Sequence, residues 1–194
     1  MTPAARPLRF ARLLRAVALL AVGLFIAFTA TFHEQLAFDV SVALGGLAII
    51  GVVTAVEYWV LRGTAESWWV AARAVIAFAA AGALLAITDS VGLSFIIAIW
   101  AALTGVVTVM RLVRRVQPPR VAVPSLLLSF ALAVSVLLVR TDPVAIIGLF
   151  GAYAVIRGVF LGISAFDTRE SVDAALAAAE PSTENSLTPD KSND

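Results

Sequence analysis

Arg157 is the residue in this chain with the most unusual placement, because it lies deep inside an apolar stretch. Counted from Pro143, where that stretch begins, it lies about 21 Å along a helix and about 9 Å from the far edge of a ~30 Å hydrocarbon core. We expect its long side chain to snorkel to that edge. A buried partner or a functional cavity is the alternative, since a charge inside a membrane is a site hypothesis by default.

Two further charges lie within apolar stretches. Arg73 is nearer the same edge than Arg157 and should snorkel more easily. Glu57 is also close to this edge, where it could pair with Arg62, Arg73 or Arg157. Glu57, Arg73 and Arg157 are therefore candidates for ion pairing or function.

Acidic residues gather at the opposite ends of the stretches, with Arg140 as the only basic residue there. Asp89 and Asp142 each follow a threonine at the start of a stretch, where aspartate is a preferred helix cap. We favour that capping interpretation. The alternative hypothesis is that these turns, together with Glu34 and Asp39, sense or buffer external acid, since such carboxylates protonate only at strongly acid pH.

The sequence offers no recognisable enzyme chemistry. It has no cysteine and a single histidine, which excludes thiolate chemistry and multi-histidine metal sites. It has no P-loop, dinucleotide-binding, zinc-protease or nucleophile-elbow motif. Its net charge of +1 argues against a nucleic-acid partner. We therefore expect a non-enzymatic protein without cofactor or metal.

Composition predicts an all-α integral membrane protein. Hydrophobic residues make up 61% of the chain and charged residues 14%, against about 45–50% and 25% in globular domains. Runs of about 20 such residues span a bilayer as helices. The first run has an apolar core longer than that of a signal peptide, so we expect it to be retained. The six predicted spans are 13–32, 38–61, 68–87, 91–110, 121–139 and 143–166.

The positions of the basic residues predict the orientation. Of the 14 lysines and arginines, only Arg140 falls on the side away from the termini. By the positive-inside rule, both termini face the cytoplasm of a multi-pass protein in the cell (inner) membrane. Residues 1–12 form a basic N-terminus, 13–166 the transmembrane domain, and 167–194 a tail that we expect to be disordered from about residue 180.

An internal repeat divides the spans into three helical hairpins, at about 13–61, 68–110 and 121–166. Thr88-Asp89 recurs 53 residues later as Thr141-Asp142, and Gly51-Val52-Val53-Thr54 recurs as Gly105-Val106-Val107-Thr108. The copies run in the same direction, which implies a pseudo-symmetry axis along the membrane normal. Small residues allow close helix packing in lipid, or alternatively a homo-oligomer interface. The predicted packing positions are Gly23, Gly51, Gly82, Gly105, Gly158 and Gly162.

This hairpin pattern resembles the HdeD-type acid-resistance membrane protein family, small bacterial proteins with six helices. The resemblance covers about residues 10 to 166. It rests on a glycine in the outward helix, an aspartate or proline at the outer turn, and an aromatic residue followed by a glycine in the return helix. These are Gly82, Asp89, Trp100 and Gly105 in the second hairpin, and Asp142-Pro143, Tyr153 and Gly158 in the third. The third hairpin has Ala133 and Ser135 in place of the outward glycine, and the first hairpin lacks the turn signature.

Two functions remain open from the sequence. The resemblance implies a non-enzymatic protein linked to acid or stress resistance, acting on the membrane or through other proteins. The alternative is a small transporter or channel with an unknown small-molecule substrate. An almost wholly apolar midplane, with Trp100 and Tyr153 as its main features, argues against ion transport by a monomer. The lipid bilayer is the one partner that composition itself predicts.

Overall fold

The computed structural model describes residues 5–29, 31, 35–64, 66–116 and 119–166, so the predicted disordered tail lies outside the described residues. The described chain forms six helices, each long and apolar enough to cross a membrane, as predicted. They are α1 (Ala5–Phe28), α2 (Leu36–Val60), α3 (Ser67–Leu84), α4 (Ser90–Val113), α5 (Pro119–Leu138) and α6 (Pro143–Phe166).

The largest difference from the predicted spans is at α1, which begins at Ala5 rather than at residue 13. The charged segment before the apolar stretch is rich in arginine, a good helix former, and Pro7 lies in the first turn, where proline is tolerated. The N-terminal basic segment is therefore largely helical. Gly63, in the turn between α2 and α3, has φ +89°, a conformation that glycine adopts without steric cost.

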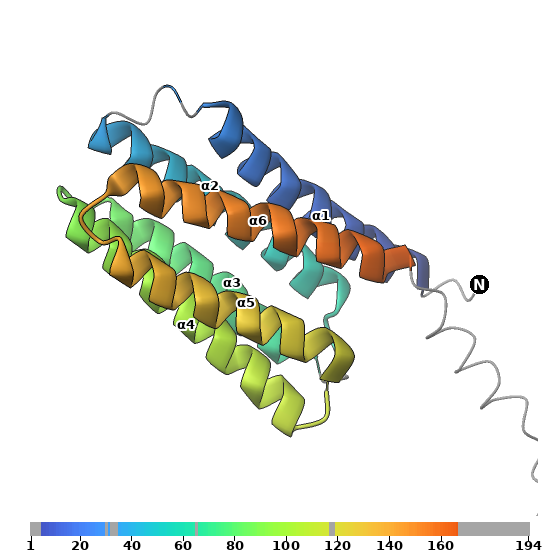
Figure 1. The fold of residues 1–194 in the computed structure, drawn as a ribbon. Coiled ribbons are helices and arrows are strands. Elements are labelled where there is room, and N and C mark those ends of the chain that lie inside the picture. The colour runs from blue at the N-terminus through green and yellow to red at the C-terminus, as the bar shows by residue number, and fades with distance from the viewer. Residues whose placement is uncertain (1–4, 30, 32–34, 65, 117–118, 167–194) are drawn as a thin grey trace, which may run out of the picture.

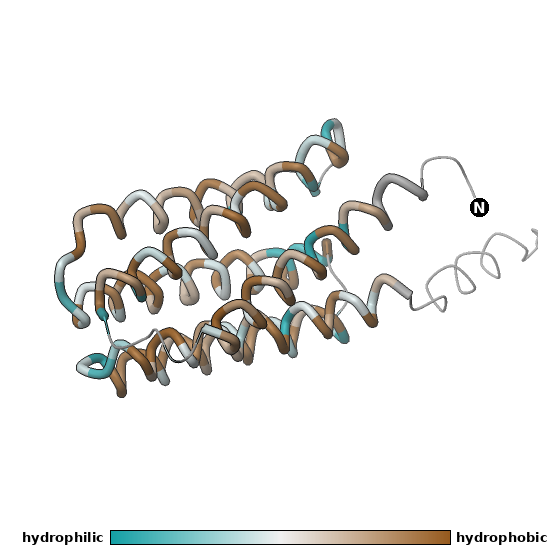
Figure 2. The backbone as a smooth tube through the Cα atoms, turned by 90° about the horizontal axis from the view of Figure 1, so that it is seen from above, coloured by the Kyte–Doolittle hydropathy of each residue, from teal (hydrophilic) through white to brown (hydrophobic). Residues whose placement is uncertain are grey.

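The helices form an antiparallel bundle with two ends (Figure 1). We call the end with the start of α1 and the end of α6 the terminal side, and the end with the α1–α2, α3–α4 and α5–α6 connections the turn side. Hydropathy along the backbone is high in the helices and low at the connections (Figure 2), as expected for membrane spans.

The closest helix pairs are α1–α6, α2–α3 and α4–α5, and the predicted outward-and-return hairpins α1–α2, α3–α4 and α5–α6 pack less extensively. Figure 1 shows α6 lying along α1, so that the last helix closes a ring with the first. The bundle therefore consists of three closely packed helix pairs. The pairs α2–α3 and α4–α5 are each linked by a terminal-side connection, whereas the pair α1–α6 brings the first and last helices together.

The repeat appears in the structure as three equivalent glycine contacts. A methyl group on Gly51 would lie 3.0 Å from the Phe78 ring, and one on Gly105 would lie 3.4 Å from the Phe130 ring. Gly158 faces Leu20 in the same way, at 2.8 Å. Each glycine comes from an even-numbered helix and each side chain from the odd-numbered helix of the same tight pair. The three pairs therefore use one packing scheme around a pseudo-threefold axis.

The other predicted packing glycines differ from one another. Gly23 lies against the backbone of α6, and Gly162 makes only an ordinary contact with Ala16 at 3.9 Å. Gly82 was predicted to pack against a helix, but it is exposed and has nothing within 4 Å. The buried face of α3 passes through Ala80, Ala81 and Leu84, which turns Gly82 outward.

Replacing Gly23 with alanine should destabilise the α1–α6 pair. The added methyl group would lie 2.7 Å from the Gly151 carbonyl oxygen, so the two backbones must move apart. We expect a loss of about 1–3 kcal/mol, seen as a fall of a few degrees in the thermal midpoint in detergent. Gly148→Ala is the matched control, because nothing lies within 4 Å of Gly148. Equal midpoints for the two variants would contradict the close approach.

Candidate functional site: a buried arginine cluster

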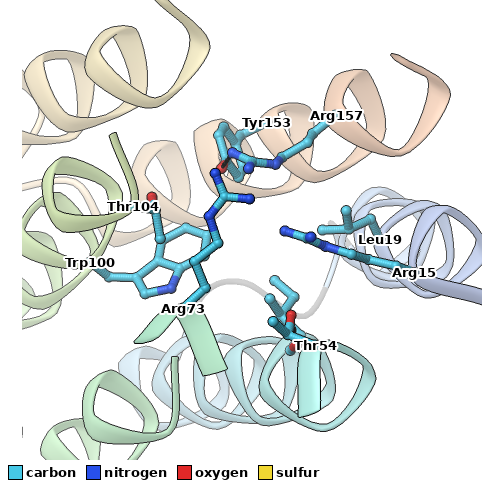
Figure 3. Close-up of a pocket in the computed structure, with 9 residues that line it drawn as sticks. Arg15, Leu19, Thr54, Arg73, Trp100, Thr104, Tyr153 and Arg157 are labelled. Carbon is cyan, nitrogen blue, oxygen red and sulfur yellow. Dashed lines mark hydrogen bonds between the residues drawn. The ribbon is translucent and has the colours of Figure 1, made fainter. Parts of the chain in front are cut away.

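A small cavity lies inside the bundle, between the midplane and the terminal side. Trp100 and Tyr153 are each about 15 Å from the turn-side start of their helices, at the depth of the midplane. Arg73 is about 9 Å from the terminal-side start of α3. Figure 3 shows the guanidinium groups of Arg15, Arg73 and Arg157 extending toward one another around this space. The lining residues are Arg15, Leu19, Ile50, Thr54, Arg73, Trp100, Thr104, Tyr153 and Arg157.

Glu57 forms a buried salt bridge with Arg15. The Arg15 Nη1 atom donates to Glu57 Oε2 at 2.9 Å, and the two side chains are only 9% and 12% exposed. Glu57 therefore forms an ion pair, as predicted, but its partner is Arg15 and not Arg62, Arg73 or Arg157. Arg15 lies inside the bundle because α1 packs against α2, which carries Glu57.

Arg73 does not snorkel, in contrast to the prediction. It is 6% exposed, and its Nη2 atom donates to the Thr108 hydroxyl of α4 at 2.7 Å. That hydroxyl in turn donates to the carbonyl of Thr104 at 2.8 Å. Arg73 shares the buried face of α3 with Val70, Ala74 and Ala77, so its side chain points to the bundle interior.

Arg157 has buried hydrogen-bond partners. This agrees with the alternative prediction of a buried partner, and the side chain does not snorkel to the membrane edge. Its Nη1 atom donates to the Tyr153 hydroxyl, one turn earlier, and to the Ser129 hydroxyl of α5 at 3.2 Å. The guanidinium carbon also lies 5.4 Å from the centre of the Tyr153 ring, within cation–π range. These contacts direct the arginine inward, because α6 buries this face against α5 and α1.

The lining residues follow the repeat. Ile50, Thr104 and Arg157 each immediately precede one of the three equivalent glycines, 51, 105 and 158, and all three line the cavity. Arg15 and Arg73 are also equivalent to each other in the repeat. Arg15 lies five residues before Leu20, and Arg73 lies five residues before Phe78, which makes the equivalent glycine contact. The cavity therefore lies where equivalent positions of the three repeats converge, on the pseudo-threefold axis.

The cavity is rich in hydrogen-bond donors and in positive charge. Within the described residues, four buried N–H groups have no hydrogen-bond partner. Three of them belong to residues that line the cavity, Arg15 Nε, Arg73 Nε and Trp100 Nε1, and the fourth, Arg111 Nε, does not. Three lining guanidinium groups face one nearby carboxylate, that of Glu57, which leaves two positive charges (3 − 1). Buried uncompensated charge costs several kcal/mol per ion. The arrangement is thus suited to holding an anion.

Sequence reasoning missed Arg15 and Arg111. Arg15 lies at the start of the predicted span 13–32 and was not singled out, although Arg15-Ala16-Val17 matches Arg73-Ala74-Val75 and could have placed the two arginines at equivalent depth. Arg111 is buried near the terminal side and pairs with Glu66 at 3.5 Å.

The turn-side aspartates are separate from this cluster. Asp89 accepts a hydrogen bond from the Gly92 amide at 3.2 Å, and Asp142 accepts one from the Ala145 amide at 3.0 Å. Both are exposed helix caps, as the favoured interpretation predicted. Asp39, grouped with them by sequence, is instead buried on α2. Among the described residues, no group of three or more His, Cys, Asp or Glu could hold a metal ion.

The chain is an integral membrane protein with six spans. No family pattern, curated protein or solved structure matches it. The resemblance to the HdeD-type family therefore stays a prediction.

Proposed function

We propose that this protein binds a small anion inside the membrane and moves it across, as a non-enzymatic transporter or channel. The observation that carries the proposal is the convergence of Arg15, Arg73 and Arg157 on one cavity, with Glu57 as the only carboxylate paired to any of the three among the described residues. Positive charge at this depth is costly and is retained where it serves a function. An anion offsets that cost, whereas a cation adds to it.

The depth of the site supports transport. Solute sites in transporters lie near the midplane, where repeats meet, and this cavity begins at Trp100 and Tyr153. The apolar midplane argued against ion transport from sequence, but arginines from three helices reach toward it. On the turn side of the cavity, Leu47, Ile97 and Phe150 are fully buried in the apolar core. An apolar barrier on one side of a midplane site is what alternating access requires.

Flux measurements with the purified full chain in liposomes test the proposal. Vesicles loaded with chloride, nitrate, acetate or phosphate would be diluted into gluconate, with valinomycin and potassium to balance charge. We expect efflux of at least one anion about tenfold faster than from protein-free vesicles, and no increase in potassium flux without valinomycin. Folded, reconstituted protein that moves no anion would overturn the proposal.

We propose an acid- or stress-resistance role as a second candidate, in line with the HdeD-type resemblance. It is supported by the placement of the residues that carry the resemblance, since Trp100 and Tyr153 both line the cavity and Gly105 and Gly158 occupy equivalent positions. The test is survival of a deletion strain after external acid shock, with rescue by the wild-type gene. Unimpaired survival would remove this candidate and leave anion transport standing.

We also propose the orientation predicted from basic residues, with the terminal side in the cytoplasm of a bacterial inner membrane. The arginine cavity then lies nearer the cytoplasm, and the two aspartate caps face outward. A homo-oligomer stays a prediction.

Replacing both Asp89 and Asp142 separates capping from acid sensing. Alanine at each position should cost about 1 kcal/mol by removing a cap, whereas asparagine should preserve stability. Thermal midpoints in detergent would check this. If the double Asn variant rescues acid survival as well as wild type does, the sensing hypothesis fails. Loss of survival with unchanged stability would support it.

A further inference from the structure

The cavity is small compared with most biological anions. Its volume of about 10 Å³ is near the room that one water molecule needs. A monatomic halide is a single sphere, somewhat larger than a water molecule. A tetrahedral oxyanion carries four oxygens, each about that size, and so needs several times the space.

The arginines are also arranged unfavourably for oxyanions. Arginine binds phosphate or carboxylate best through two parallel N–H groups of its fork. Here one Nη atom of each fork already has a protein partner: Arg15 Nη1 binds Glu57, and Arg73 Nη2 binds Thr108. Arg157 Nη1 binds Tyr153 and Ser129. The fully buried donors without a partner on Arg15 and Arg73 are single Nε–H groups, which suit a one-atom acceptor.

Trp100 supplies the third unpartnered donor, from α4. Its ring is 3% exposed and is held by edge-to-face contacts with Phe150 and Tyr153, with centroids 5.7 and 5.6 Å away. These contacts fix the direction of the indole N–H. The equivalent position in the third repeat is Tyr153, whose hydroxyl is engaged with Arg157. The unpartnered donors of the lining residues are therefore the neutral Trp100 Nε1–H and the Nε–H groups of Arg15 and Arg73.

We infer that the site takes a dehydrated monatomic anion of the halide class, with Trp100 Nε1–H as a specificity-determining ligand beside Arg15 Nε and Arg73 Nε. This inference rests on the proposed anion function and narrows its substrate. A spherical ion accepts hydrogen bonds from any direction, so it does not require the parallel pair of donors that an oxyanion binds best. An oxyanion would leave oxygens without donors in a buried site, which is costly.

The test is an affinity comparison on the full chain in detergent, by calorimetric titration with chloride, bromide, phosphate and sulfate in gluconate buffer. We expect halides to bind at least about tenfold more tightly than phosphate or sulfate. Trp100→Phe keeps the ring and removes the N–H, and should weaken halide binding about tenfold or more, since a hydrogen bond to a charged group is lost. Trp68→Phe is the matched control, because Trp68 is 72% exposed at the start of α3, and should leave affinity unchanged.

The outcomes separate this inference from the proposed function. If phosphate or sulfate binds as tightly as chloride, the halide inference fails while anion binding stands. If Trp100→Phe folds and binds chloride like wild type, the role of Trp100 fails. If no anion binds or moves, the proposed function itself fails. Should Trp100→Phe not fold, indole ¹⁵N NMR of wild type replaces it: the Trp100 signal, assigned by single Phe variants of Trp59, Trp68 and Trp69, must shift on chloride titration, and an unmoved signal overturns the inference.

Discussion

Glu57→Gln should be the most destabilising single substitution in the arginine cluster. It leaves Arg15, Arg73 and Arg157 facing one cavity without the carboxylate that pairs with Arg15 at 2.9 Å. Removing one partner of a buried ion pair costs about 3–5 kcal/mol. We therefore expect the thermal midpoint in detergent, in gluconate buffer, to fall by roughly 6–20 °C.

Arg15→Gln should cost clearly less than Glu57→Gln. It removes one of three like charges, and Glu57 still interacts electrostatically with Arg73 and Arg157. This asymmetry distinguishes a cation-rich site from an isolated salt bridge, for which the two losses would be similar. Equal midpoints for the two variants would contradict the charge count on which the proposed function rests.

Chloride should restore part of the stability that Glu57→Gln loses. A ligand that binds only the folded state stabilises it by mass action, and the variant has one uncompensated charge more than wild type. The midpoint of Glu57→Gln should therefore rise more steeply with chloride than that of wild type. Glu66→Gln is the control, because Glu66 pairs with Arg111 at 3.5 Å and does not line the cavity.

Arg73→Gln should lower halide flux in liposomes by at least about 100-fold. The change removes one positive charge and one unpartnered Nε–H from the cavity. A unit charge about 4 Å from the ion is worth about 4 kcal/mol at an effective dielectric constant of 20, well above the ~2.7 kcal/mol that a 100-fold change requires. Flux from chloride-loaded vesicles into gluconate is the measurement.

Two comparisons keep the Arg73 result interpretable. Arg62→Gln is the control for net charge, because Arg62 is exposed and lies 4.6 Å from the Trp59 ring at the terminal side; its flux should equal that of wild type. Arg73→Lys keeps the charge but lacks the planar fork and the Nε–H donor, so its flux should lie between those of wild type and Arg73→Gln. Normal flux in a folded Arg73→Gln variant would exclude Arg73 from the site.

Hydropathy and the repeat were sufficient to predict the six helices. A run of some 20 apolar residues can satisfy its backbone in lipid only as a helix, so composition alone specifies the number of spans. The recurring Thr-Asp and the glycines at 51, 105 and 158 indicated three copies, and the glycine contacts with Phe78, Phe130 and Leu20 agree. The caps at Asp89 and Asp142 were equally local, since a cap depends on the helix start beside it.

The arginine cluster was not predictable in this way. Depth along a helix says how far Arg73 and Arg157 lie from the membrane edge, but not which direction they face. That direction depends on how the helices are rotated about their own axes, which the packing of all six decides. The partner of Glu57 depends on α1 lying against α2, and the Tyr153 and Ser129 contacts of Arg157 depend on α6 lying between α1 and α5. The sequence by itself therefore determined the spans, the repeat and the positions of the charges along them, because these follow from local hydropathy and spacing. Only the tertiary structure decided that three of those charges meet at one cavity, because that requires contacts between residues far apart in the chain.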